Sequence, residues 1–286
     1  MSYNPIPDYH LHSLFSGDCE TPIADIINAA KKAGLTSLCL TDHNDLDHPP
    51  LPDGTDFNLD FDKYFPALVK LKEELGNGTS KMLSPGETFD FRIGIEQGVM
   101  PTTYEKLMNF SADHPELDFI ICSTHFFEEL DPYYPEFWEN KEPESAYRKY
   151  FEEMLYTVEH FKDYCVYGHL DYIFRYGPGP KREAEINVRK YMDVIEAILK
   201  EIISSGKGIE INTGSLYRGM DYAHPHIEIL KLYKDLGGEI LTFGSDAHDN
   251  IHLGYSFSDA AKLAKSLGFK YYCTYSQLKP TFVTLP

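Results

Sequence analysis

The 286-residue sequence has few positive charges, few cysteines and no long apolar run. Its 26 Lys and Arg residues are outnumbered by 45 Asp and Glu residues, which gives a formal net charge of −19. Binding to a nucleic-acid backbone or an anionic membrane surface needs clustered Lys and Arg, so this balance argues against both partners. No stretch is apolar for long enough to span a bilayer, and the chain does not start like a signal peptide. We therefore expect a cytoplasmic protein.

The five cysteines are odd in number and form no CxxC pair. Cys39, Cys122 and Cys165 lie inside apolar runs, which is typical of buried thiols in a reducing compartment. The sequence therefore predicts neither a disulfide framework nor a zinc–thiolate site. It also lacks a glycine-rich phosphate loop after the first predicted strand, which argues against a doubly wound nucleotide-binding sheet.

Short apolar segments alternate with amphipathic segments along most of the chain. The predicted strands are 8–12, 36–40, 91–95, 118–122, 165–167, 208–211 and 239–243. The predicted helices are 22–33, 60–75, 104–112, 144–161, 183–204, 225–236 and 258–266, and Thr21 is the expected cap of the first one. Seven strand–helix rounds imply parallel pairing with right-handed crossovers, and closing such a sheet gives an α/β barrel. The length fits one domain of this kind.

The regular alternation of apolar and amphipathic segments is lost between about residues 44 and 90, where Pro, Asp and Gly are frequent. One helix is predicted inside this stretch, at 60–75. Barrels carry specificity in the loops that follow their strands, so we interpret residues 44–90 as an insertion on the functional rim.

Metal-ligating residue types recur just after the predicted strands. In an extended segment, side chains two residues apart point to the same side, so His10 and His12 can bind one cation together. Two histidines in a strand are more often ordinary packed residues, but the pattern repeats at one strand end after another. The recurring set is His10, His12, Asp18, His43, Glu96, His125, His169, Asp246 and His248. Because the carboxyl ends of barrel strands meet at one face, we expect these side chains to share a pocket.

Nine candidate ligands exceed the four or five that one zinc ion takes. We therefore predict two or three divalent metal ions, with the two oxygens of Glu96 as the natural bridge between two of them. Imidazole and carboxylate donors without thiolate suit Zn, Fe or Mn better than Mg or Ca. Cations in the pocket would also allow a very acidic protein to hold an anionic substrate.

These motifs resemble the polymerase and histidinol phosphatase (PHP) family. The resemblance runs from Asp8 to His248 and rests on His10-x-His12, Thr41-Asp42-His43, Glu96, His125, His169 and Asp246-x-His248. It implies one distorted (βα)7 TIM-like barrel over residues 1–286, with a trinuclear metal centre that hydrolyses phosphate esters. Residues 168–176 and 210–213, together with Arg218, are similar to the monofunctional histidinol-phosphate phosphatase branch, which acts on L-histidinol phosphate in histidine biosynthesis. Asp18 departs from the family pattern, because some relatives have a histidine there.

The resemblance also implies roles for individual residues. The first metal ion would be held by His10, His12, Glu96 and Asp246, the second by Glu96, His125 and His169, and the third by Asp18, His43 and His248. Asp18 or His43 is the expected general acid for the leaving alkoxide. Arg175 and Arg218 follow strand ends, and we expect their guanidinium groups to clamp the phosphoryl oxygens, although loop arginines are more often solvated. His224 is expected to begin a helix, with a substrate contact as the alternative.

Two other functions are compatible with the sequence. The first is a phosphoesterase of the same family that acts on a nucleotide, on another small phosphate ester or on single-stranded nucleic acid, although the acidic charge argues against the last. The second is a non-catalytic metal-binding module, which an open barrel mouth disfavours because structural metal sites are closed. The protein is expected to be a monomer or a homodimer.

Overall fold

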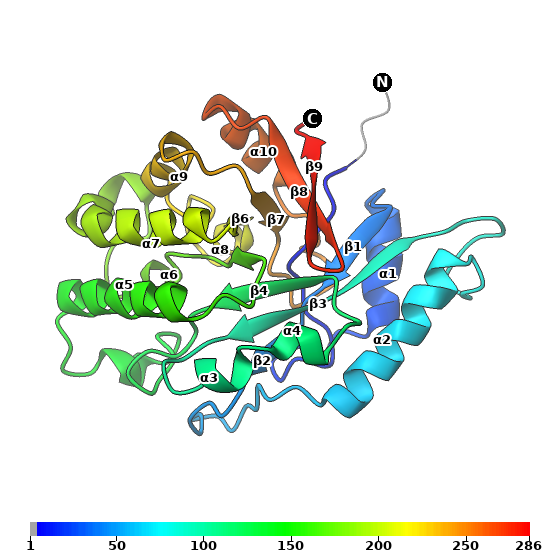
Figure 1. Cartoon of the computed structure of the whole chain (residues 1–286), viewed down its shortest axis with the longest axis horizontal. Coiled ribbons are helices and arrows are strands. Elements are labelled where there is room, and N and C mark those ends of the chain that lie inside the picture. The colour runs from blue at the N-terminus through cyan, green and yellow to red at the C-terminus, as the bar shows by residue number, and fades with distance from the viewer. Residues whose placement is uncertain (1–4) are drawn as a thin grey trace.

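Seven parallel strands form the central sheet of the computed structural model, which describes residues 5–286 (Figure 1). They are β1 (Ser37–Leu40), β2 (His43–Asp45), β3 (Asp90–Gly98), β4 (Phe119–Ser123), β5 (Val166–Tyr167), β6 (Gly208–Asn212) and β7 (Leu241–Gly244). The sheet order is β1-β3-β4-β5-β6-β7, and β2 pairs with β3 beyond the end of β1. β1 and β2 therefore occupy a single, interrupted position in the sheet.

The segment 8–12 lies between β1 and β7 and closes the sheet into a ring. Asp8 forms a parallel bridge with Leu38, and Leu11 forms one with Ala247. The ring then has seven strand positions, which confirms the predicted distorted (βα)7 barrel. The prediction of a regular strand at 8–12 is wrong, because side chains replace ladder partners there: the N–H of Leu11 donates to the hydroxyl of Thr41 (3.1 Å).

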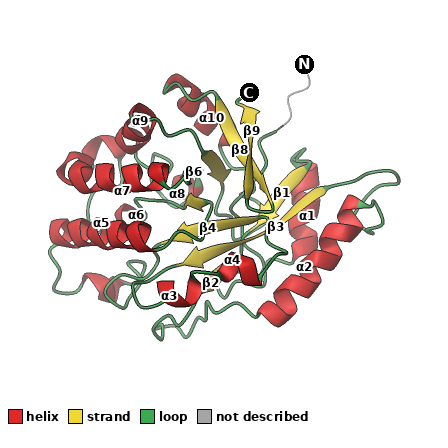
Figure 2. Ribbon diagram, in the orientation of Figure 1, coloured by secondary structure: helices red, strands yellow, loops and turns green. Residues whose placement is uncertain are grey.

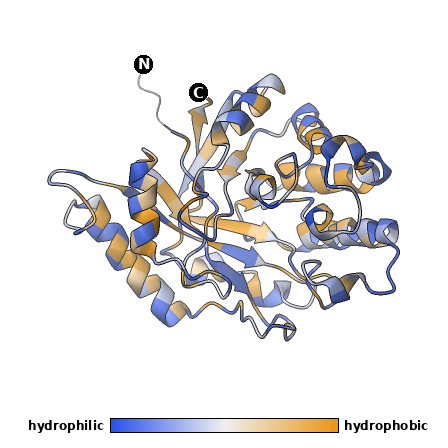
Figure 3. Cartoon of the chain, turned by 180° about the vertical axis from the view of Figure 1, so that it is seen from behind, coloured by the Kyte–Doolittle hydropathy of each residue, from blue (hydrophilic) through white to orange (hydrophobic). Residues whose placement is uncertain are grey.

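Helices surround the ring (Figure 2). They are α1 (Ile23–Lys32), α2 (Phe61–Gly76), α3 (Tyr104–Leu107), α4 (Phe110–Asp113), α5 (Pro143–His160), α6 (Ile173–Tyr176), α7 (Met192–Ser204), α8 (Gly214–Tyr217), α9 (Ile227–Asp235) and α10 (Phe257–Ser266). Most of these helices carry both hydrophobic and hydrophilic residues (Figure 3), as expected for helices that lie between the core and solvent. No helix in the described range 5–286 is long and apolar enough to cross a membrane.

Three helix predictions need correction. The helix predicted at 104–112 is divided into α3 and α4. The one predicted at 183–204 starts as two 3-10 turns, because Glu183 is held by α9, whose Ile227 N–H it accepts (3.0 Å), and Ile186 is extended. Thr21 does not cap α1; its hydroxyl donates to the carbonyl of His248 (3.2 Å), and Pro22 occupies the cap position.

The segment predicted as a rim insertion contains both β2 and α2. Residues of α2 are buried against the sheet, and the Tyr64 hydroxyl donates to the carbonyl of Gly94 in β3 (2.7 Å). This helix therefore takes the place of the regular barrel helix between β2 and β3. Residues 46–60 and 77–89 are irregular, and we propose that the first of these stretches, which contributes Asp53, Thr55 and Phe57 to the cavity, is the rim insertion.

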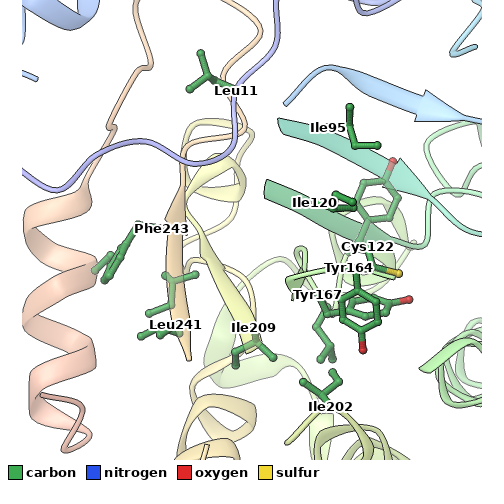
Figure 4. Packing of buried hydrophobic residues seen from close by; sticks show 14 of the residues in the cluster. Leu11, Ile95, Ile120, Cys122, Tyr164, Tyr167, Ile202, Ile209, Leu241 and Phe243 are labelled. Carbon is green, nitrogen blue, oxygen red and sulfur yellow. The ribbon is translucent and has the colours of Figure 1, made fainter. Parts of the chain in front are cut away.

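Hydrophobic side chains from strands and helices pack together outside the ring. In Figure 4, Leu241 and Phe243 of β7 and Ile209 of β6 lie on the sheet, and Ile202 reaches toward it from α7. All four side chains are buried. The outer helical layer is therefore attached to the sheet by apolar burial, which is the main stabilising term of such a fold.

A C-terminal hairpin, which the sequence did not predict, covers the amino end of the barrel. It consists of β8 (Tyr271–Ser276) and β9 (Lys279–Thr284), which pair antiparallel. Its buried Tyr275 packs with Tyr9 and Phe119 in a second hydrophobic cluster. The N–H of Leu278 donates to the carbonyl of Asp118, just before β4 (2.9 Å). The hairpin thus seals the end of the ring that is opposite to the strand C-termini.

We predict that Tyr9→Phe destabilises the protein by about 1–3 kcal/mol. The Tyr9 hydroxyl donates to the carbonyl of Tyr275 (3.1 Å) and accepts its N–H (2.9 Å), so the substitution leaves two buried backbone groups without partners. Denaturant unfolding measures the change. Tyr271→Phe is the matched control, because Tyr271 lies on the same hairpin and its side chain is 44% exposed. Equal stability of both variants would contradict this role of Tyr9.

Candidate active site

A cavity of about 280 Å³ opens at the carboxyl ends of the barrel strands. Seven of the nine predicted metal ligands line it: Asp18, His43, Glu96, His125, His169, Asp246 and His248. The other two, His10 and His12, are fully buried and contact Glu96 and Asp246. The barrel therefore brings together all nine side chains, although they come from residues 10 to 248 of the sequence.

The carboxylate of Glu96 lies at the centre of this cluster. It projects from β3 and is completely buried. Its two oxygens lie within 3.5 Å of nitrogen atoms from His10, His12, His43, His125 and His169. Oε2 is 3.1 Å from Nε2 of His10 and 3.0 Å from Nδ1 of His43, whereas Oε1 is 2.7 Å from Nε2 of His169. Each oxygen thus faces a different set of imidazoles, as a bridging carboxylate would.

The remaining predicted ligands lie around His12 and at the mouth of the cavity. Oδ1 of Asp246 is 3.6 Å from Nε2 of His12 and 3.7 Å from Nδ1 of His248. Oδ2 of Asp18 is 3.1 Å from Nε2 of His248 and 3.7 Å from Nε2 of His43. The Asp18 side chain is 36% exposed, so it connects the cluster with solvent.

Several buried polar atoms of the cluster lack a hydrogen-bond partner within residues 5–286. They include Nε2 of His10, Nε2 of His12, Nδ1 of His43 and Oε2 of Glu96. Buried polar atoms are nearly always paired, so several unpaired ones that face each other need an explanation. Donor atoms aimed at a shared metal ion provide it, and mixed imidazole and carboxylate donors suit divalent transition metals. The residues present therefore fit a metal centre.

Four groups of side chains could each hold an ion, with ligand atoms within 4.8 Å of one another. They are His10, His12 and Asp246; His10, Glu96 and His169; His12, His43 and His248; and His43, Asp45 and His125. These groups overlap with the predicted sets but differ from them, since Glu96 is not in the first group and His10 replaces His125 beside Glu96 and His169. His12 takes the place that was predicted for Asp18, and Asp45 joins His43 and His125.

The protonation states of the cluster depend on burial and on neighbouring charges. Burial disfavours the ionised form of Glu96, but the surrounding imidazoles outweigh this effect and hold its pKa well below the usual range. Burial and the neighbouring imidazoles of His248 and His43 hold the pKa of His12 well below its usual value, which keeps this ring neutral. An ionised carboxylate and a neutral imidazole are the forms that bind metals.

Two buried carboxylates that the sequence analysis missed support the histidines from behind. Oε1 of Glu210 is 2.7 Å from Nδ1 of His10, and Oδ1 of Asp45 is 2.9 Å from Nδ1 of His125. A carboxylate on the far nitrogen fixes the tautomer and orientation of a metal-ligating imidazole. Strand alternation is a signal that could have found Asp45, because it lies two residues after His43 on β2 and so on the same face.

A glycine in β7 makes room for one of these carboxylates. A Cβ atom at Gly244 would lie 2.0 Å from Oε1 of Glu210 and 2.3 Å from Cβ of His10. Any larger residue would therefore displace the supporting contact between Glu210 and His10. This explains on steric grounds why the residue two positions before Asp246 is a glycine.

Asp42 belongs to the Thr-Asp-His motif but anchors a loop and does not face the cavity. Its carboxylate accepts the N–H of Ser13 (2.6 Å) and the hydroxyl of Ser16 (2.8 Å). The Ser16 hydroxyl in turn lies 3.0 Å from Nδ1 of His12. Asp42 therefore orients His12 through Ser16, while burial raises its own pKa.

Both predicted arginines line the cavity and contact the same carboxylate. Nη1 of Arg175 and Nη1 of Arg218 each lie 3.3 Å from Oδ2 of Asp246. Nη2 of Arg175 has no hydrogen-bond partner within the described residues, so this donor is available to a ligand. The predicted substrate contact of His224 needs correction: its side chain does not line the cavity, because it is fully buried and bound to Asp171.

Acidic and aromatic side chains form another wall of the cavity, and Phe57 and Tyr172 of this wall pack against His43 and His169. This wall, which the sequence analysis did not identify, consists of Asp53, Phe57, Asp131, Tyr133, Tyr134, Tyr172 and Tyr176. The hydroxyl of Tyr172 donates to Asp131 (2.9 Å), and the hydroxyl of Tyr134 donates to Asp53 (2.9 Å). Burial raises the pKa of Asp131 to about 6. We call this group the acidic–aromatic wall.

Comparison with known proteins gives consistent relatives. Residues 8–214 match the PHP domain. A histidinol-phosphatase from Lactococcus lactis subsp. lactis (strain IL1403) is 31% identical over 273 residues, which are 95% of each chain. A probable histidinol-phosphatase from Thermotoga maritima is 30% identical over 264 residues, which are 92% of this chain and 93% of the relative.

Two solved structures share the fold over most of the chain. The crystal structure of histidinol phosphate phosphatase from Lactococcus lactis, complexed with Zn, L-histidinol and phosphate, superposes with a TM-score of 0.80 at 29% identity and covers 98% of this chain and 100% of that one. A putative histidinol phosphatase from Listeria monocytogenes has a TM-score of 0.71 at 17% identity and covers 88% of this chain and 99% of that one. The second likeness concerns the fold alone.

We predict that Glu96→Gln lowers the metal content of the purified protein at least about tenfold. The neutral amide removes the charge that faces five imidazoles and presents an NH2 group to some of their nitrogens. Elemental analysis measures the change. Glu153→Gln is the control, because Glu153 lies on α5 and its pKa is raised by burial and by Glu128, which is outside the cluster. Wild-type metal content in the Glu96 variant would contradict a bridging role.

We also expect Glu210→Gln to weaken metal binding by roughly 10- to 100-fold while the ligands themselves remain. The neutral amide holds Nδ1 of His10 less strongly than the carboxylate does, so the imidazole is less well oriented and less basic. Competition with a chelator of known affinity gives the dissociation constant. An unchanged constant would show that Glu210 has no role in metal binding.

Proposed function

The chain belongs to the PHP family, and from this premise we propose that it is a metal-dependent phosphomonoesterase that hydrolyses L-histidinol phosphate to L-histidinol and phosphate. This reaction is a step of histidine biosynthesis. The observation that carries the proposal is the cluster of imidazoles and carboxylates around Glu96, which opens into a cavity that also holds two arginines. The Lactococcus lactis relative, whose crystal structure contains Zn, L-histidinol and phosphate, supports the choice of substrate.

We propose that the cluster holds two to three divalent metal ions, which are Zn, Fe or Mn. The proposed ligands are His10, His12, Asp18, His43, Glu96, His125, His169, Asp246 and His248. When bound, the ions supply positive charge for the phosphoryl oxygens and make water acidic enough to act as a nucleophile near neutral pH. Glu210 and Asp45 keep the ligating imidazoles oriented from behind.

The chain itself supplies the rest of the phosphate site. Arg175 has an unpaired Nη2 within the described residues, and Arg218 also lines the cavity and contacts the same oxygen of Asp246. Guanidinium groups match the geometry of phosphate oxygens, so both residues are proposed to bind the phosphoryl group, and Arg175 to stabilise its charge during the reaction.

The leaving alkoxide needs a proton, and Asp18 and His43 are the proposed donors. Their side chains lie 3.7 Å apart at the cavity, and Asp18 is partly exposed to solvent. Nδ1 of His43 lies 3.0 Å from Glu96 and Nε2 faces Asp18, so a neutral ring that binds a metal ion through Nδ1 would carry its proton on Nε2. The pair can therefore pass a proton from solvent to the departing oxygen, so that water and ester give alcohol and phosphate.

The acidic–aromatic wall fits the alcohol part of this substrate. L-Histidinol carries a protonated amine and an imidazole ring. Carboxylates such as Asp53 and Asp131 attract the amine, and the tyrosine rings offer faces and edges on which an imidazole can stack. A nucleotide offers no amine cation of this kind. We therefore favour L-histidinol phosphate over other small phosphate esters. We also propose that the protein acts as a monomer or a homodimer.

A substrate panel tests the proposal. With Zn, Mn or Fe supplied, we expect kcat/KM for L-histidinol phosphate to exceed the values for a nucleoside monophosphate and for an aryl phosphate by at least about tenfold, since the wall favours a cation by more than about 1.4 kcal/mol. Phosphate release measures all three rates. Equal rates would favour the broader phosphoesterase, and no turnover with any of the metals would refute phosphoester hydrolysis.

We expect Arg175→Ala to keep its metal content and to raise KM for the phosphate ester about 10- to 100-fold, as loss of a charged hydrogen-bond donor does. Arg148→Ala is the control, because Arg148 pairs with Asp193 outside the cavity. Steady-state kinetics and elemental analysis of the same preparations separate the two effects. Loss of metal from the Arg175 variant would show instead that this residue maintains the metal cluster.

A further inference from the structure

The guanidinium group of Arg175 is held at several points and free at one. Its side chain is only 3% exposed. Nη1 contacts Asp246 (3.3 Å), Nε lies 3.4 Å from Nε2 of His224, and the group lies over the rings of Tyr172 and Tyr176, 5.3 Å and 5.7 Å from their centroids. Nη2 has no hydrogen-bond partner within residues 5–286. The side chain is therefore oriented so that one donor group is left for a ligand in the cavity.

His224 is the contact of Arg175 on the side away from the cavity. Its side chain is completely buried, and Nδ1 lies 2.5 Å from Oδ1 of Asp171, which is also buried. The second oxygen of Asp171 accepts the N–H of His226 (2.9 Å). Asp171, His224 and Arg175 thus form a continuous line of polar contacts that ends in the cavity.

The chemistry of the three groups fixes the tautomer of His224. An ionised carboxylate only accepts hydrogen bonds, so the proton must lie on Nδ1 of His224 and be donated to Asp171. The Nε–H group of Arg175 only donates, so Nε2 of His224 must carry the free lone pair. Both contacts are satisfied together only by a neutral imidazole with its proton on Nδ1.

The backbone of His224 is attached to a rigid part of the barrel. Its N–H donates to the carbonyl of Asn212, and the N–H of Asn212 donates back to the carbonyl of His224, each at 2.8 Å. Asn212 is the last residue of β6. The imidazole is therefore fixed relative to the strand ends that also carry the proposed metal ligands, and a group fixed in this way can position its neighbour closely.

We propose that Asp171 and His224 are positioning residues that hold Arg175 with Nη2 directed at the phosphoryl group of the substrate. This inference rests on the proposed phosphatase function for the identity of the ligand. It reassigns His224 from a substrate contact to a residue that acts through Arg175. Neither Asp171 nor His224 lines the cavity, so any effect of these residues on phosphate binding passes through the guanidinium.

Kinetics of single and double variants test the proposal. His224→Phe removes the acceptor for Nε of Arg175, and we expect KM for L-histidinol phosphate to rise about tenfold, with metal content unchanged. His224→Gln places an amide oxygen near the position of Nε2, and we expect it to restore most of the binding. In an Arg175→Ala background the substitution His224→Phe should change KM less than twofold, because the group through which it acts is gone.

His226→Phe is the matched control, since His226 lies in the same segment, is 4% exposed and does not contact Arg175. We expect it to change stability and to leave KM near the wild-type value. A tenfold rise in KM for His226→Phe, or an equal effect of His224→Phe with and without Arg175, would overturn the proposal in favour of general damage to the loop.

Binding of inorganic phosphate to the metal-loaded protein separates this inference from the proposed function. Calorimetry should show weaker phosphate binding for His224→Phe by a similar factor of about ten. If the wild-type protein does not hydrolyse L-histidinol phosphate but the phosphate result holds, the substrate is wrong and the positioning role stands. If phosphate binds both proteins equally, the positioning role is wrong whatever the substrate.

The tautomer provides a test that is read on the wild-type protein, with the His224→Gln variant used only to assign the signals of His224. In protein labelled with 15N-histidine, long-range 1H–15N correlation spectra distinguish a protonated from an unprotonated ring nitrogen. We expect the signals that vanish in His224→Gln to show a neutral ring with the proton on Nδ1. A ring protonated on Nε2 could not accept from Arg175 and would overturn the inference.

Discussion

The carboxylate of Glu96, buried among imidazoles, is the interaction on which the rest of the site depends. An ionised carboxylate in a protein interior is stable only if charges or dipoles replace the water it has lost. Here the replacement is a shell of histidine nitrogens, several of which are themselves unpaired. Further carboxylates, among them Asp246, Asp45 and Glu210, surround this shell. Cations bound among these buried carboxylates would balance their negative charge, and this relation connects the acidic residues of the cluster with the proposed metal centre.

The convergence of the ligands could be predicted because the barrel imposes it. Parallel strands in a closed ring end on one face, so His43, Glu96 and His125 had to approach each other once the strands were recognised. The supporting carboxylates were harder to find. Asp45 shares the strand face of His43 and Glu210 begins one of the branch segments, but their role behind the imidazoles becomes visible only when the far nitrogen of each ring is located. Sequence patterns thus indicate the groups that face the cavity better than the groups that stand behind them.

Other sequence-based predictions were wrong or missing where contacts between distant residues outweigh the local structural preference of a segment. Residues 8–12 have the alternation of a strand, but the hydroxyl of Thr41 takes one of its hydrogen bonds and only isolated bridges remain. The C-terminal hairpin was missed because its pairing is stabilised by the barrel floor, which a short sequence window does not contain. The acidic–aromatic wall combines residues from two loops and from helix α6 with its N-cap, without any common period. Such features follow from the closed ring and not from the segments themselves.

The hairpin at the amino end of the barrel has a consequence for how the protein is made. Tyr9 and Tyr275 are 266 positions apart, yet their contact joins the two ends of the described chain. During synthesis Tyr275 must be added to the chain before this contact can form, and β7 must also be made before segment 8–12 gains its second neighbour. Contacts of such high sequence separation form slowly because a large loop must close first. A nascent chain therefore carries its first histidines before the ring that gathers them exists, and the complete pocket can form only after His248 has been synthesised.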